Sequence, residues 1–69
     1  MNQKEYYKKL KEFLIGFYEV TNLFISLDQF LLFIEMLTQK KKPDLYYVDY
    51  TNLYNFILDR TDVPLTKNK

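Results

Sequence analysis

Apolar side chains recur every three or four residues over the first part of the chain. They are Tyr6, Leu10, Phe13, Leu14 and Phe17, and most of the lysines and glutamates between them fall on the other side of the helical wheel. This spacing predicts an amphipathic helix over residues 4–19. Thr21 and Asn22 then interrupt the pattern, so we expect an extended link or a short strand over residues 20–25.

A second predicted helix begins after Ser26. The sequence Ser26-Leu27-Asp28-Gln29 fits a capping box, in which the serine oxygen accepts a hydrogen bond from a free backbone N–H and the glutamine reaches back. We expect this helix to run from residue 27 to about residue 39, because Pro43 disfavours helical geometry in the residue before it.

The second predicted helix is apolar on almost every side. Its main apolar face carries Leu27, Phe30, Leu31, Ile34 and Leu37. The opposite side shows Leu32 and Met36, flanked by Phe33. Since a helix that is apolar all round is buried all round, two explanations stay open: the other helices enclose it, or Leu32 and Met36 contact another molecule.

Residues 45–60 contain the third helical pattern. Tyr50, Leu53, Phe56 and Ile57 have helical spacing, and Asp49 is a candidate N-cap. We predict a helix from about residue 49, preceded over residues 45–48 by a helical turn or a short strand.

These patterns predict an all-α, three-helix domain over residues 1–65 with a central hydrophobic second helix and a polar tail over residues 66–69. A chain of 69 residues has room for one small domain only. The predicted core consists of Tyr6, Leu10, Phe13, Leu14, Phe17, Leu27, Phe30, Leu31, Ile34, Leu37, Leu53, Phe56 and Ile57.

The composition offers little chemistry for catalysis. Cysteine and histidine are absent and the chain has one glycine, Gly16, which leaves no thiol or imidazole and no glycine-rich phosphate loop. Ser26 is explained as a helix cap, and no pair of acidic residues has the spacing of a calcium loop. We therefore expect no enzyme, no catalytic residues, no cofactor, no metal and no small-molecule substrate.

Aromatic residues are unusually frequent, since seven tyrosines and six phenylalanines make up 19% of the chain. Each can bury about 150–250 Å², so the apolar surface exceeds what one small core absorbs. Such a surplus is typical of an interface. We therefore predict a protein–protein interaction module, an adaptor, regulator or inhibitor that forms a homodimer or binds a larger protein. Its predicted contact residues are Leu32, Met36, Tyr47, Tyr54 and Leu58.

An alternative function is nucleic-acid binding. Lys4, Lys8, Lys9, Lys11, Lys40, Lys41 and Lys42 could contact phosphates, while Tyr6 and Tyr7 could stack on bases. The formal net charge of only +1 argues against a dedicated nucleic-acid-binding protein. We therefore rank this function second.

No segment reaches the roughly 20 apolar residues of a membrane-spanning helix. Attachment of the first helix to a membrane surface ranks last, because glutamates share its polar face with the lysines. We expect a soluble, cytoplasmic protein. The richness in Lys, Asn, Tyr, Phe and Ile resembles the composition of small accessory proteins of AT-rich bacteria and their phages, and no motif indicates a particular family.

Overall fold

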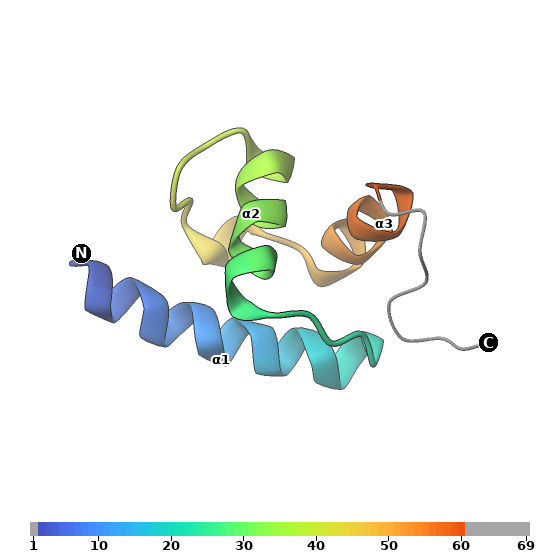
Figure 1. The fold of residues 1–69 in the computed structure, drawn as a ribbon, viewed down its shortest axis with the longest axis horizontal. Helices are drawn as coiled ribbons and strands as arrows, with labels where there is room; N and C mark the ends of the chain where they lie inside the picture. Colours follow the sequence, from blue (N-terminus) through green and yellow to red (C-terminus); the bar gives the residue numbers. More distant parts are fainter. Residues whose placement is uncertain (1, 61–69) are drawn as a thin grey trace.

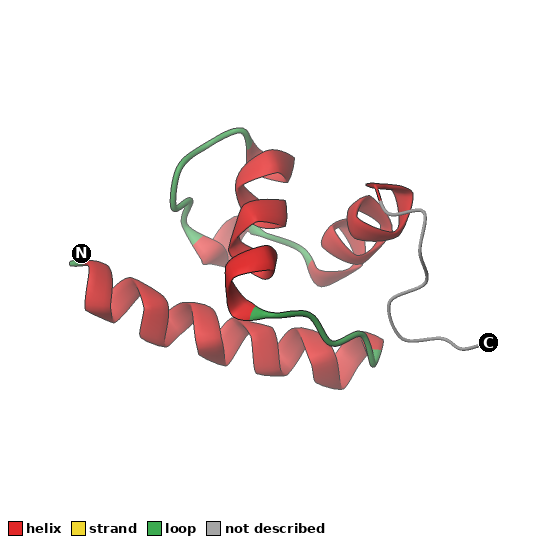
Figure 2. Cartoon of the chain, in the orientation of Figure 1, coloured by secondary structure: helices red, strands yellow, loops and turns green. Residues whose placement is uncertain are grey.

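The computed structural model describes residues 2–60, which form three α-helices and one short 3-10 helix. These are α1 (Gln3–Thr21), α2 (Leu27–Thr38), the 3-10 helix η1 (Leu45–Tyr47) and α3 (Tyr50–Arg60). Figure 2 shows only helices and connecting loops in this part of the chain. The predicted all-α class is confirmed, and the predicted boundary at residue 65 and the tail 66–69 lie outside the described residues.

Side-chain caps fix where the helices begin. The Asn2 side chain accepts a hydrogen bond of 2.8 Å from the Glu5 N–H at the start of α1. Ser26 accepts one of 3.3 Å from the Gln29 N–H, which confirms Ser26 as the N-cap of α2. Both helices end in a left-handed residue, Asn22 (φ 63°) and Gln39 (φ 60°).

The connection from α2 to α3 is neither a strand nor a continuous helix. Asp44 accepts a hydrogen bond of 3.0 Å from the Tyr46 N–H and so starts η1. Asp49 accepts one of 3.0 Å from the Asn52 N–H and so starts α3. Two aspartate caps five residues apart leave room for one helical turn between them. The helical-turn alternative for residues 45–48 is therefore correct, and the strand alternative is wrong.

The helices pack around α2. In Figure 1, α1 lies along the bottom of the view, α2 rises from its middle, and α3 lies beside α2 above the C-terminal half of α1. Each of the three α-helices contacts the other two. The side chains that are completely enclosed are Phe17, Phe30, Leu10, Leu23, Ile34, Leu53 and Ile57.

The predicted core is confirmed in its centre, and its remaining members pack against that centre. Five of its members are only partly buried, namely Phe13, Leu14, Leu27, Leu37 and Phe56. Five buried residues were not predicted: Leu23, Ile25, Phe33, Pro43 and Val48. The link between α1 and α2 explains two of them, because in an extended segment alternate side chains point to opposite sides. Leu23 and Ile25 point inward as a result, and Phe24 between them is exposed.

Phe33 corrects the expected faces of α2. Its side chain is buried, although the sequence placed it beside the exposed pair Leu32 and Met36. Successive residues of a helix are rotated by 100° about its axis, so the buried side chains of Phe33, Ile34 and Leu31 cover an arc of about 160° around α2. This wide arc is buried because α1 and α3 both contact α2. The first of the two explanations therefore holds over this arc only, because the side with Leu32 and Met36 is left exposed. Contact of that side with another molecule stays a prediction.

An aromatic cluster joins α1 to α3 and α2. The Tyr50 ring lies 4.8 Å from the Phe13 ring and 6.0 Å from the Phe17 ring, and Phe17 lies 5.1 Å from Phe30, measured between ring centroids. Tyr50 also lies directly over Gly16, where a Cβ atom would overlap the tyrosine hydroxyl. The one glycine of the chain therefore allows α3 to approach α1 closely.

Candidate interaction surfaces

The outer face of α2 carries two exposed apolar side chains. Leu32 is 50% exposed and Met36 is 41% exposed. They lie one helical turn apart, and with Lys40 and Lys41 they line a shallow hollow of about 250 Å³ whose rim also includes Glu35. The structure therefore brings these two predicted contact residues together on one surface.

The other three predicted contact residues lie elsewhere. Tyr47 belongs to η1 and is 80% exposed. Leu58 is exposed on α3, while Tyr54, one turn earlier, is half-buried against the core. The five predicted residues therefore lie on three different elements, and only Leu32 and Met36 share a hollow.

Two exposed aromatic pairs were not predicted. The first is Tyr18 of α1 with Phe24 of the link, whose rings meet edge to face with centroids 6.2 Å apart. The second pairs Tyr47 with Tyr46, which is 85% exposed, and their ring centroids are 5.1 Å apart. Tyr46 lies four residues before Tyr50, but η1 ends before Val48, so the helical spacing of α3 does not extend back to Tyr46.

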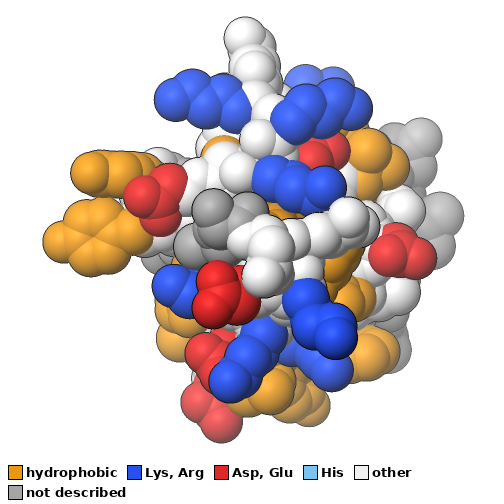
Figure 3. Space-filling model, turned by 90° about the vertical axis from the view of Figure 1, so that its left-hand side faces the viewer, with side chains coloured by type: hydrophobic (Ala, Val, Ile, Leu, Met, Phe, Trp, Pro, Cys, Tyr) orange, Lys and Arg blue, Asp and Glu red, His pale blue; other side chains and the backbone are white. Residues whose placement is uncertain are grey.

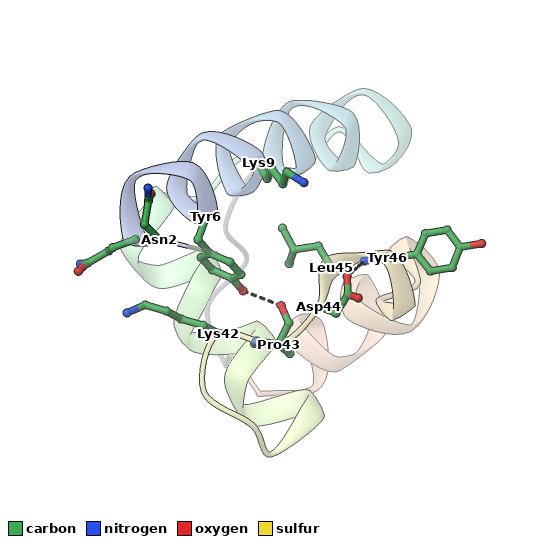
Figure 4. Close-up of a pocket in the computed structure, with 9 residues that line it drawn as sticks. Asn2, Tyr6, Lys9, Lys42, Pro43, Asp44, Leu45 and Tyr46 are labelled. Atoms are coloured by element: carbon green, nitrogen blue, oxygen red, sulfur yellow. Dashed lines mark hydrogen bonds between the residues drawn. The ribbon is translucent and has the colours of Figure 1, made fainter.

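A groove runs between α1 and the segment 42–50. Its deeper part has a volume of about 660 Å³ and is lined by the start of α1 and by Lys42, Pro43, Asp44 and Leu45. A neighbouring hollow of about 500 Å³ shares Lys9, Leu45 and Tyr46 with it. We call the two together the α1 groove. Figure 4 shows Tyr6 projecting from α1 toward the loop and Lys9 extending alongside α1, while the Tyr46 ring points outward.

One side-chain hydrogen bond ties the loop to α1 at the floor of the α1 groove. The Tyr6 hydroxyl donates a buried bond of 2.8 Å to the carbonyl oxygen of Pro43 (Figure 4). Burial, followed by the negative charge of Glu35, raises the pKa of Tyr6 to about 12. Since Tyr6 is buried, the expectation that it stacks on a base is wrong.

A basic face includes the two lysines that line the α1 groove, Lys9 and Lys42, whereas its members Lys40 and Lys41 line the hollow on α2. It consists of the exposed lysines at the start of α1 and in the loop after α2: Lys4, Lys8, Lys9, Lys11, Lys40, Lys41 and Lys42. Figure 3 views the left-hand side of Figure 1 and shows several Lys or Arg side chains on this side, with carboxylates interspersed. The backbone N–H of Lys42 donates a hydrogen bond of 3.0 Å to Glu35, which holds the loop against α2. Two segments that are distant in sequence thus bring positive charge to one side.

Within residues 2–60, no cluster of three acidic side chains is placed to hold a metal ion. None of the described helices combines the length and the apolar character needed to cross a membrane. No protein-family model matches the chain, and neither a curated protein nor a solved structure matches it.

Proposed function

We propose that this chain is a small, non-catalytic protein–protein interaction module of the cytoplasm, which binds a second copy of itself or a larger protein. The outer face of α2 is the centre of its contact surface. The observation that carries the proposal is the exposure of Leu32 and Met36 on a helix whose other side is already enclosed by α1 and α3. Tyr47 and Leu58 offer further apolar contact area on neighbouring elements.

The fold leaves the apolar surface on the outer face of α2 unused. The three-helix core is closed by seven side chains with almost no exposure, so the folding of this domain does not require apolar groups at positions 32 and 36. An exposed helix face normally carries polar residues. Leucine and methionine there are costly to leave in water and favourable to bury against a partner, and methionine adapts its shape to irregular surfaces.

The double variant Leu32→Gln/Met36→Gln tests this proposal. Glutamine keeps an aliphatic stem and a helix propensity close to those of leucine and methionine, so the fold stays intact while the face becomes polar. Self-association is the form of binding that can be measured on the chain alone, by sedimentation equilibrium over a range of concentrations. We expect the wild type to associate and the variant to stay at 8.5 kDa, with circular dichroism unchanged.

The double variant Ile15→Gln/Val20→Gln is the matched control. It removes two exposed apolar side chains from α1 and leaves α2 untouched. We expect it to associate as the wild type does. Equal loss of association in both variants would show that the chain associates through non-specific hydrophobic contacts. Loss of helicity in the α2 variant would show that Leu32 and Met36 belong to the core. Either result would overturn the proposal.

Nucleic-acid binding is the second candidate function, and one specific observation favours it. Tyr46 is exposed and lines the α1 groove with Lys9 and Lys42, and its ring packs against the exposed Tyr47. Exposed rings near lysines are typical of single-strand binding. The test is retention of the chain on single-stranded DNA at low salt. Salt-sensitive retention that disappears on neutralising Lys40, Lys41 and Lys42 would support this function, and absence of retention at low salt would exclude it.

A further inference from the structure

The exposed residues of α2 and its C-terminal cap form a set that is symmetric about residue 34. Between residues 27 and 40, the exposed positions are Asp28, Gln29, Leu32, Met36, Gln39 and Lys40. Each residue of the set has a counterpart at the same sequence distance on the other side of position 34. The counterpart pairs are Leu32 and Met36 at two residues, Gln29 and Gln39 at five residues, and Asp28 and Lys40 at six residues. We call these six residues the α2 stripe.

We propose that the α2 stripe pairs with the same stripe of a second copy, with the two α2 helices antiparallel about a two-fold axis that crosses the exposed side of α2 at the height of residue 34 along the helix. This inference rests on the proposed function, because it names the partner of the same surface. A two-fold axis brings residue i of one copy against residue j of the other, and residue j against residue i. When the helices are antiparallel, residues i and j are the two that lie at equal sequence distances on either side of position 34.

Each counterpart pair is chemically complementary. Leu32 meets Met36, which buries two apolar side chains together. Gln29 meets Gln39, and two amides can exchange donors and acceptors. Asp28 meets Lys40 at each end, so a carboxylate faces an ammonium group. A stripe with acid at one end, base at the other and apolar residues in the centre fits a reversed copy of itself.

Other arrangements lack this complementarity. A parallel pairing of α2 helices would place Asp28 against Asp28 and Lys40 against Lys40, and like charges in contact oppose association. Pairing through the basic face would bring lysines of both copies together. The antiparallel α2 pair is the arrangement that brings opposite charges and apolar groups into contact at the same time.

The stripe is narrow, so we expect a weak dimer. It occupies one side of the 12-residue helix α2 and the two residues after it, and interfaces well below about 1,200 Å² in total area belong to weak or transient complexes. The test therefore needs high protein concentration or covalent capture. Covalent capture suits this chain because it contains no cysteine of its own.

The experiment mixes equal amounts of two single-cysteine chains, Gln29→Cys and Gln39→Cys, under mild oxidation. A disulfide needs Cα atoms within about 7 Å of each other. In the antiparallel pair, position 29 faces position 39 of the other copy, while two copies of position 29 lie about 15 Å apart along the helix axis. We expect about tenfold more mixed dimer than identical dimer by mass spectrometry. A Glu19→Cys chain, altered on the exposed side of α1, serves as the control and should crosslink slowly.

The outcomes separate this inference from the proposed function. Dominant mixed dimers support the antiparallel pair. Dominant identical dimers, or crosslinking no faster than in the Glu19→Cys control, overturn it. If self-association of the wild type is still lost in Leu32→Gln/Met36→Gln, the interaction function stands and only the antiparallel arrangement fails. If the wild type does not associate, the self-binding form of the function fails as well.

Discussion

The contact between Gly16 and Tyr50 gives a prediction in which two effects of opposite sign compete. Gly16→Ala should improve the helix propensity of α1 by about 1 kcal/mol, because glycine in a helix interior is unfavourable. The new Cβ atom, however, would overlap the Tyr50 hydroxyl. The Tyr50 ring cannot move away freely, since its centroid lies 4.8 Å from that of Phe13 and 6.0 Å from that of Phe17.

The magnitude follows from these two terms. Forcing an extra carbon into a packed site costs about 1–3 kcal/mol, so Gly16→Ala should destabilise the protein by up to about 2 kcal/mol in spite of the better propensity. Removing the hydroxyl changes the balance. In Tyr50→Phe the nearest ring atom to the new Cβ is the ring carbon that carried the hydroxyl, at 3.2 Å. A shift of a few tenths of an ångström relieves that contact, so Gly16→Ala should then be neutral or stabilising by up to about 1 kcal/mol.

Urea unfolding of the four proteins, followed by circular dichroism, measures this cycle. With a slope of about 1 kcal/mol per M for a chain of this size, Gly16→Ala should lower the midpoint by up to about 2 M when Tyr50 is retained. When Gly16→Ala is combined with Tyr50→Phe, the midpoint should equal or exceed that of Tyr50→Phe alone. A midpoint that rises equally in both backgrounds would refute the close approach of α3 to α1.

Further predictions concern the loop and the α2 stripe. Tyr6→Phe removes the hydrogen bond to Pro43 and should lower the free energy of unfolding by about 1 kcal/mol in urea titration. The pKa of Tyr6 is raised to about 12 in the folded protein from about 10, so the unfolded chain ionises first. The contribution of the Tyr6 hydroxyl to the free energy of unfolding is therefore present below pH 10 and is lost as the pH rises to 12. Over that interval the wild type should lose more stability than Tyr6→Phe, and equal losses would contradict the assignment. Asp28→Lys and Lys40→Glu should each weaken self-association about tenfold. An equimolar mixture of the two should restore it, because the mixed dimer again pairs opposite charges, whereas a mixture as weak as either variant alone would contradict the pairing.

Short-range patterns in the sequence were sufficient to predict the three α-helices. Ser26 and Asp49 were identified as caps from the residues around them, and both accept the bonds of a helix start. Apolar spacing identified Leu10, Phe17 and Leu53 as buried. These features depend on contacts within a few residues, which a single sequence encodes directly.

Features that depend on neighbouring elements were not accessible from the sequence. Phe33 is buried because α1 and α3 together cover a wider arc of α2 than one neighbour would. Tyr46 is exposed because an aspartate cap starts η1, and Val48 ends it, before α3 begins. The α1 groove joins the start of α1 to residues 42–50, whose proximity results from the fold. The symmetry of the α2 stripe could be recognised only once the exposed positions of α2 were known.

The most direct test of the central claim is the molar mass of the wild-type chain over a dilution series, measured by light scattering. A narrow interface calls for concentrations up to about 1 mM. We expect a mass that rises from 8.5 kDa toward twice that value with concentration, and that stays at the lower value in Leu32→Gln/Met36→Gln. A wild-type mass that remains at 8.5 kDa up to the highest concentration would contradict the pairing of α2 with its own copy.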